Sequence, residues 1–303
     1  LSRVISAVED QSDDYRELLG KLYLKSGSAL KIGITGPPGA GKSSLVNNVS
    51  KALASNGKTV AVIAVDPSSP FTGGALLGDR IRLTDMPTDG SIFIRSMATR
   101  GNLGGLARTT ADVIKIMDGF GKDWVIVETV GVGQDEVEIA KTADTTVVVL
   151  APGLGDTVQS MKAGVMEIAD LYVINKADRS GADSLVTEVR VRVEQDSHIK
   201  EADWQAPVLK TVAVEDQGTE PLLEAIENHR SFLEKSGRLE KVRREKTRQE
   251  TLSLLTEEIS CNILEKILGD GQFDDLIDDI VAHRKDPYTS VKEIVGTIFP
   301  EEE

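Results

Sequence analysis

Apolar residues recur along the chain in two alternating patterns. Short runs of aliphatic and β-branched residues predict buried strands of a parallel sheet, and segments with apolar residues three and four apart predict helices between them. The predicted strands are 32–35, 59–65, 91–94, 124–128, 145–150, 171–174 and 208–213. The predicted helices are 12–25, 43–54, 103–118, 135–142, 157–168, 183–193 and 221–233. This alternation predicts an α/β fold, a mostly parallel sheet with helices on both faces.

The pattern changes after Gly237. Residues 238–248 are rich in Arg and Lys, and an apolar stripe at helical spacing follows until Gly269, which predicts one long amphipathic helix. A further helix is predicted at 273–284. Such helices need a partner for their apolar face, and two interpretations stay open: packing on the core, or a dimerisation arm. The predicted parts are an N-terminal helical extension at 1–28, a central α/β domain at 29–235 and a C-terminal helical dimerisation or packing arm at 236–303.

A phosphate-binding loop lies between the first predicted strand and the helix after it. Residues 36–43 read GPPGAGKS, a complete G-x-x-x-x-G-K-S motif in the strand–loop–helix context that it requires. The glycines let successive backbone N–H groups face a polyphosphate at a helix N-terminus. Lys42 is expected to reach the β- and γ-phosphates, and the Ser43 hydroxyl to bind Mg²⁺. The predicted contacts of the loop are Gly36, Pro37, Pro38, Gly39, Ala40, Gly41, Lys42, Ser43 and Ser44.

The tetrad Asn175-Lys176-Ala177-Asp178 follows the predicted strand 171–174 and indicates which base is bound. The Asp178 carboxylate can accept hydrogen bonds from guanine N1–H and from its 2-amino group, while Lys176 covers the ring face. Adenine lacks both donors and would leave Asp178 unpaired, at a cost of about 1–3 kcal/mol or more. The sequence therefore favours GTP over ATP.

The predicted strand 124–128 ends in Glu128, and Gly131 follows shortly after it. This is the place of the D-x-x-G element that senses the γ-phosphate, with a longer carboxylate that acts on Mg²⁺ directly or through water. The Gly131 amide is expected to contact the γ-phosphate, which makes 129–138 a switch segment. Val132 stands where many small GTPases carry a water-positioning Gln, and Gln134 is a weak substitute. Slow intrinsic hydrolysis, accelerated by a partner, is the expected consequence.

Two further carboxylates lie in the Gly-, Pro- and Ser-rich stretch after the second predicted strand. Asp66 ends that strand on the nucleotide side, and Asp79 stands between Gly78 and Arg80. Carboxylates there can enter the Mg²⁺ sphere when GTP is bound and leave after hydrolysis.

Composition narrows the possible partners and compartments. The formal charge of −14 argues against nucleic acid and anionic membranes as partners. A single cysteine excludes an internal disulfide and fits a reducing compartment, and no apolar run approaches the length of a membrane span. Because the chain begins at Leu1, a trimmed N-terminus is expected. The expected location is cytoplasmic, with a mitochondrial counterpart left open.

Several long blocks resemble one family. They are VDPSSPFTGGALLGDRIR, FIRSMATRGNLGGLA, ETVGVGQDEVEIAKTADTTVVVLAPGLGDTVQSMKAGVMEIAD and NKAD. These blocks are similar to the MeaB/ArgK-type P-loop GTPases, whose vertebrate relative is the methylmalonic aciduria type A protein, and the similarity runs over nearly the whole chain. The resemblance implies a homodimeric GTPase that chaperones an adenosylcobalamin-dependent acyl-CoA mutase of the methylmalonyl-CoA mutase type. Such proteins gate cofactor loading and protect or reactivate the mutase.

The resemblance also assigns roles by position. It implies Mg²⁺-site residues at Ser43, Asp66, Asp79 and Glu128, and catalytic roles for Lys42, Glu128 and Asp79. It implies an extra switch loop at 151–162 that signals to the mutase through Asp156, Gln159 and Lys162. The guanine-contacting loop is Thr211, Val212 and Ala213, where relatives often have Ser in the middle position. The backbone N–H of Ala213 is expected to meet guanine O6.

The sequence does not indicate a transition-metal site or a cobalamin site, and it leaves two alternative functions. Cys261 stands alone and the histidines His198, His229 and His283 are scattered, so no metal site beyond Mg²⁺ is expected. Residues 196–201 lack the glycine of a D-x-H-x-x-G motif, so the chain is not expected to bind cobalamin itself. The alternative function is a P-loop ATPase or kinase linked to transport of lysine, arginine and ornithine. A third hypothesis is a scaffold that binds GTP but hardly hydrolyses it. It differs from the GTPase only in the rate of hydrolysis.

Overall fold

The computed structural model describes residues 1–9, 15–66, 89–98, 105–129, 142–154, 165–200, 203–269 and 272–298. The chain divides into two compact units, Leu1–Val242 and Arg243–Glu303. The strands of the first unit are β1 (Leu30–Thr35), β2 (Val60–Asp66), β3 (Ile92–Ala98), β4 (Trp124–Thr129), β5 (Thr145–Leu150), β6 (Leu171–Ile174) and β7 (Val208–Lys210). Its helices are α1 (Ser2–Glu9), α2 (Tyr15–Tyr23), α3 (Lys42–Ser55), α4 (Gly105–Gly119), α7 (Ala182–Lys200) and α8 (Thr219–Lys235), with the short 3₁₀ turns η2 (Val165–Ile168) and η3 (Ala213–Glu215).

The second unit is helical. It contains most of α9 (Arg238–Gly269), which begins in the first unit, together with α10 (Gln272–Val281) and α11 (Pro287–Ile298). Among the described residues, no helix combines the length and the apolar character that crossing a bilayer requires.

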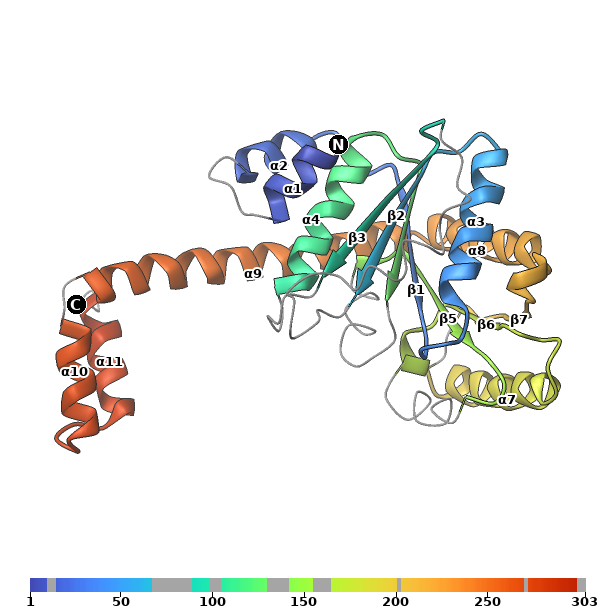
Figure 1. Cartoon of the computed structure of the whole chain (residues 1–303). Helices are drawn as coiled ribbons and strands as arrows, with labels where there is room; N and C mark the ends of the chain where they lie inside the picture. The colour runs from blue at the N-terminus through green and yellow to red at the C-terminus, as the bar shows by residue number, and fades with distance from the viewer. Residues whose placement is uncertain are drawn as a thin grey trace. The chain divides into compact units, whose positions relative to one another are not determined.

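The strands form one seven-stranded parallel sheet in the order β3-β2-β4-β1-β5-β6-β7 (Figure 1). The seven predicted strands and the α/β fold class are therefore confirmed. β1 lies at the centre, between β4 and β5. Because all strands are parallel, their carboxyl ends meet at one edge of the sheet, which is where ligands of such folds bind.

Several boundaries differ from the prediction. β7 ends at Lys210 rather than at 213, because the chain turns back on itself and Val212 exchanges backbone hydrogen bonds with Gln217. The predicted helix 157–168 is described only at its end, where it is the 3₁₀ turn η2. Of the predicted helix 135–142, all but the last residue lies outside the described residues.

Two helices were missed. α1 is only eight residues long and is held by the burial of Ile5 and Val8 against β2, β4 and α4. α11 at the C-terminal end was also not predicted. Short helices such as these depend on tertiary contacts more than on their own propensity.

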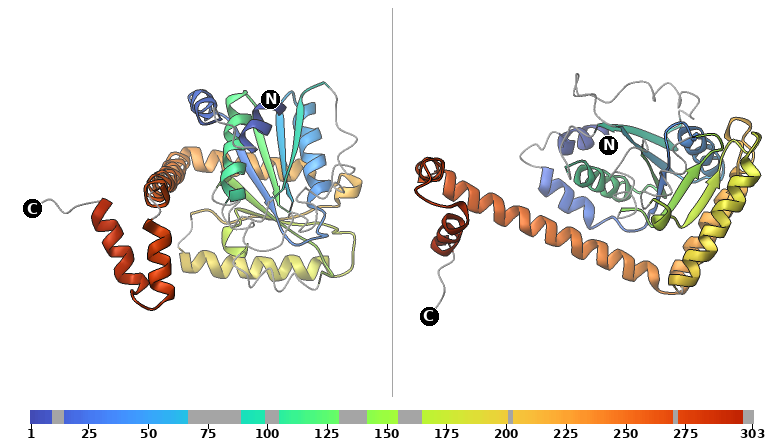
Figure 2. Two further views of the ribbon diagram at one scale, coloured as in Figure 1. Left: turned by 60° about the vertical axis from the view of Figure 1, so that its left-hand side comes forward. Right: turned by 90° about the horizontal axis from the view of Figure 1, so that it is seen from below.

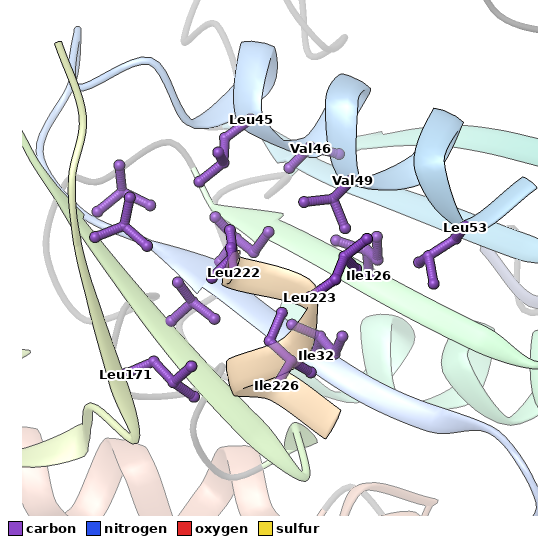
Figure 3. Close-up of a cluster of buried hydrophobic side chains, with 14 of the residues drawn as sticks. Ile32, Leu45, Val46, Val49, Leu53, Ile126, Leu171, Leu222, Leu223 and Ile226 are labelled. Atoms are coloured by element: carbon purple, nitrogen blue, oxygen red, sulfur yellow. The ribbon is translucent and has the colours of Figure 1, made fainter. Parts of the chain in front are cut away.

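Helices α3 and α8 cover one face of the sheet. Leu45, Val46, Val49 and Leu53 make an apolar stripe at helical spacing along α3, and Figure 3 shows this stripe directed at Ile32 and Ile126 of the sheet and at the leucines of α8. Full burial of each such aliphatic side chain contributes about 1.5–3 kcal/mol. This packing fixes the helix whose first residues belong to the phosphate loop.

Helices α1, α2, α4 and α7 cover the opposite face, as Figure 2 shows for α4 relative to α3. In β2, Val60 and Val62 are buried beneath α3, whereas Ala61 and Ile63 are buried beneath α1 and α4. Strands buried on both faces explain the near-continuous apolar runs of the sequence.

A buried carboxylate joins the N-terminal segment to the sheet layer. Asp118, at the end of α4, is 1% exposed and accepts backbone hydrogen bonds from residues 27–29 at 2.7–3.1 Å. Lys31 pairs with the same carboxylate at 3.3 Å. These bonds satisfy the buried charge and hold the chain where it enters β1.

A buried histidine lies at the amino edge of the sheet. The Nδ1 atom of His229 is 2.9 Å from the Thr145 hydroxyl, its Nε2 atom is 3.5 Å from an Asp170 oxygen, and its ring packs on Trp204 at 4.7 Å. Burial lowers the pKa of His229 to about 4, although the negative charge of Asp144 works in the opposite direction.

This depressed pKa predicts a loss of stability in mild acid. Between pH 6.5 and 4 the unfolded chain binds a proton at His229 that the folded chain does not, so the free energy of unfolding falls as the pH falls through this range. At pH 5 the effect of His229 alone is about 2 kcal/mol relative to pH 7. Urea unfolding of the wild type and of His229→Gln at both pH values measures it. The variant should lose about 2 kcal/mol less than the wild type on acidification, and an equal loss in both proteins would contradict the assignment.

Candidate functional site

The phosphate loop occupies the turn from the central strand β1 into α3. Gly36, Gly39 and Gly41 have φ values of 137°, 77° and 92°, which side chains rarely adopt. A Cβ atom on Gly36 would lie 2.0 Å from the Val149 carbonyl oxygen, so the loop also needs glycine there for space. The loop therefore lies against β5 and presents the first N–H groups of α3, an arrangement that favours anions.

Lys42 is held within this loop. Its side chain is only 5% exposed, and its Nζ atom donates to the carbonyl oxygens of Gly36 at 2.7 Å and Pro37 at 3.1 Å. These bonds keep a buried ammonium group solvated by the loop itself. The geometry places a positive charge at the centre of the loop, as phosphate binding requires.

Ser43 and Glu128 come together across the site. The Ser43 hydroxyl donates to Glu128 Oε1 at 2.6 Å, and Glu128 is 8% exposed. A hydroxyl that donates its proton to a carboxylate keeps its lone pairs for a cation. Two hard oxygen groups fit Mg²⁺, which usually takes one or two protein ligands together with phosphate oxygens and water.

Asn175 connects the phosphate loop to the segments that were predicted to recognise the base. It is 2% exposed, and its Nδ2 atom donates to the Ala40 carbonyl oxygen at 2.8 Å. Its Oδ1 atom accepts from the Thr211 hydroxyl and from the Ala213 N–H, each at 3.0 Å. One side chain thus joins three parts of the site that are far apart in sequence.

Lys176 and Asp178 flank this connection. Lys176 adopts a φ of 57° and its Nζ atom donates to the Gly39 carbonyl oxygen at 2.6 Å, so its stem crosses from the tetrad to the phosphate loop. Asp178 is exposed, available to the donors of a base. The structure therefore brings the predicted phosphate and guanine residues into one site.

The loop after β7 is fixed through both backbone polar groups of one residue, Ala213. The Ala213 N–H, which was predicted to meet guanine O6, donates to Asn175 in this structure, and the Ala213 carbonyl accepts from Asn48 Nδ2 at 2.7 Å. Asn48, on α3, was missed from the sequence because only the packing of α3 beside η3 brings it to this loop. Its position five residues after Ser43 carries no signal of its own.

The remaining predicted residues divide in two groups. Asp66 ends β2, as predicted, and Leu154 at the start of the predicted switch loop lies against the phosphate loop, 3.8 Å from where a Gly39 Cβ would be. The others lie outside the described residues: Asp79, Gly131, Val132, Gln134, Asp156, Gln159 and Lys162. Their roles stay predictions. Within the described ranges, no three His, Cys, Asp or Glu side chains gather as metal ligands.

Comparisons with known proteins agree on one family. The family model described as "Methylmalonyl Co-A mutase-associated GTPase MeaB" matches residues 1–267. A protein of Pyrococcus abyssi named as a GTPase is 48% identical over 300 residues, covering 97% of this chain and 92% of the relative. The mouse protein named methylmalonic aciduria type A homolog, mitochondrial, is 37% identical over 214 residues, covering 69% of this chain and 51% of the relative.

A solved structure supports the same fold. The crystal structure of a protein named LAO/AO transport system kinase superposes with a TM-score of 0.68 at 28% identity, covering 98% of this chain and 92% of that chain. A family match over most of the chain, joined to the phosphate loop and the guanine tetrad, confirms the resemblance seen in the sequence. The chain belongs to the MeaB family of P-loop GTPases.

Proposed function

We propose that this GTPase serves an adenosylcobalamin-dependent acyl-CoA mutase of the methylmalonyl-CoA mutase type. In this role it gates cofactor loading and protects or reactivates the mutase, without holding cobalamin itself. The proposal that the protein binds a guanine nucleotide rests on the Asn175 side chain. This side chain of the guanine tetrad bonds both the phosphate loop and the loop after β7. The client is proposed from the description of the family, which names a methylmalonyl-CoA mutase.

The described residues support separate roles for Lys42, Ser43 and Glu128 in GTP hydrolysis. Lys42 leaves the loop carbonyls for the β- and γ-phosphates and offsets the charge that builds on them in the transition state. Ser43 and Glu128 would hold Mg²⁺, which neutralises phosphate charge when bound. Since Val132 cannot orient water, we propose that basal turnover is slow and that the client accelerates it.

The predicted switch loop 151–162 begins beside the nucleotide. Ala151 is buried and Leu154 packs toward Gly39, so the entry of this loop touches the segment that surrounds the phosphates. We propose that Asp156, Gln159 and Lys162 carry the signal from this contact to the client.

We further propose that the functional form is a homodimer formed through α9. Apolar side chains on the middle of this helix are 43–54% exposed, an arrangement that favours a partner face; they are Leu252, Leu254, Leu255 and Ile259. The helix is basic at 238–248 and carries Glu257 and Glu258 later, so two antiparallel copies would pair opposite charges. Sedimentation velocity tests this, and the mass of a single chain at every concentration would reject it.

The client proposal predicts stimulated GTP hydrolysis. Steady-state phosphate release is measured with the chain alone and with a purified adenosylcobalamin-dependent acyl-CoA mutase. We expect a rate increase of at least about tenfold, since partners that complete a GTPase site raise turnover by larger factors. An acyl-CoA enzyme without cobalamin and the Lys42→Ala variant serve as controls. If the chain binds GTP tightly but no cobalamin-dependent mutase stimulates hydrolysis, the proposed mutase client is rejected, whereas the assignment as a GTPase stands.

The second candidate function is an ATPase or kinase linked to transport of basic amino acids. It draws on the name of the structural relative, LAO/AO transport system kinase. Against it stands the tetrad at 175–178, which selects guanine. Competition of ATP with GTP at comparable concentration would favour this candidate, whereas displacement by guanine nucleotides alone would exclude it.

A further inference from the structure

A pair of buried hydroxyls joins β1 to β4 where their backbone pairing ends. The register of the two strands runs to Ile34 opposite Glu128. One residue further, the Thr129 hydroxyl donates to the Thr35 hydroxyl at 2.9 Å, and the two residues are 3% and 0% exposed. A side-chain bond therefore continues the connection of the strands beyond the backbone ladder.

This hydroxyl pair is next to both halves of the proposed Mg²⁺ site. Thr35 directly precedes Gly36, the first residue of the phosphate loop, and Thr129 directly follows Glu128. Glu128 in turn accepts from Ser43 at 2.6 Å. The phosphate loop and the Glu128 carboxylate are thus linked twice, once through Ser43 and once through the two threonines.

The hydroxyls are not needed to fill the core. Valine has the shape of threonine without the polar atom, and most neighbouring residues of β1 and β4 are aliphatic. Burying a hydroxyl is unfavourable unless it is hydrogen-bonded, and a satisfied pair contributes little net stability compared with two apolar groups of the same shape. What the pair does supply is a directional contact of fixed length.

We propose that Thr35 and Thr129 form a positioning pair that holds the Glu128 carboxylate on the Ser43 hydroxyl. The pair thereby sets how strongly Mg²⁺ enhances nucleotide binding. This inference rests on the proposed function, in which Ser43 and Glu128 serve a guanine nucleotide with Mg²⁺. It adds two residues that contact neither the metal nor the nucleotide and act through their neighbours.

A double-mutant cycle separates positioning from stability. The variants are Thr35→Val, Thr129→Val and both together, with Thr→Ser at both positions as the conservative variant. Each is measured by urea unfolding and by GDP affinity in EDTA and in millimolar Mg²⁺. Each single valine leaves one buried hydroxyl unpaired and should lower stability, while the double valine variant should recover most of it.

The Mg²⁺ enhancement of GDP affinity should behave differently. We expect it to fall about tenfold in both single variants and to stay low in the double valine variant, because the contact of fixed length is absent in all three. The double serine variant should keep most of the enhancement. Thr145→Val is the matched control: it removes a buried hydroxyl that bonds His229 at the opposite edge of the sheet, and should lower stability without changing the enhancement.

The outcomes are distinct. A double valine variant with the wild-type Mg²⁺ enhancement would overturn the positioning role and leave a purely structural pair. A wild type that binds GDP equally well with and without Mg²⁺ would also overturn it, while keeping the guanine-nucleotide site. A wild type that binds no guanine nucleotide would reject the proposed function itself.

Discussion

Replacing Asp178 with asparagine is expected to turn the protein from a guanine-nucleotide binder into a xanthine-nucleotide binder. Asp178 is exposed and follows Lys176, whose φ is 57°. In the proposed site its carboxylate offers two acceptor oxygens to guanine N1–H and the 2-amino group. An amide offers one acceptor and one donor group, which match xanthine N1–H and its 2-oxo group. A site built for hydrogen bonds rejects a ligand that leaves its polar groups unpaired.

The expected size of this change is large. GDP affinity should fall by about 100-fold or more, because GDP loses its two charge-assisted hydrogen bonds to Asp178. XDP should become the tighter ligand, because the amide of the variant matches the N1–H and the 2-oxo group of xanthine. Isothermal titration of both nucleotides against the wild type and Asp178→Asn measures it. Asp183→Asn is the control, since Asp183 is a nearby exposed carboxylate that pairs with Lys210. Equal losses for GDP and XDP would show that Asp178 does not read the base edge.

Replacing Asn175 with alanine is expected to damage the fold and the site together. The substitution leaves the Ala40 carbonyl, the Thr211 hydroxyl and the Ala213 N–H without their bonds in a buried region. Unpaired buried polar groups are costly, so we expect a loss of about 3 kcal/mol of stability. GDP affinity should fall by about 100-fold, because Asn175 no longer fixes the distance between the phosphate loop and the predicted guanine-contacting loop at 211–213.

Urea unfolding and GDP titration measure both effects. Thr211→Val removes only one of the three bonds and should cost about 1 kcal/mol with a much smaller loss of affinity. A variant Asn175→Ala that keeps wild-type stability but loses GDP would contradict the bridging role, and would make Asn175 a ligand-contacting residue only.

Much of the fold was predictable because its signals are local. The apolar runs of β1, β4, β5 and β6 mark strands buried on both faces, and such runs need no knowledge of their neighbours. The boundary of β7 was not predictable, because it depends on the backbone pairing of Val212 with Gln217. Likewise α1 forms because Ile5 and Val8 meet a surface made by other elements.

The candidate site shows the same difference between local sequence signals and tertiary contacts. The motif at 36–43 and the tetrad at 175–178 state the chemistry of phosphate and guanine in short, contiguous stretches, and the spacing from strand to loop to helix places them at the carboxyl edge of the sheet. The sequence by itself therefore determined the fold class and the family, and it predicted the nucleotide site.

Only the tertiary structure decided which side chains act on one another. The bonds Ser43 to Glu128, Asn48 to Ala213 and Thr129 to Thr35 join residues 85, 165 and 94 positions apart. No periodicity connects such pairs, since each contact exists only when the sheet order places β1 beside β4 and α3 beside η3. A hydrogen bond needs its partners within a few tenths of an ångström, and that distance is set by the packing of the whole layer rather than by any local run of residues.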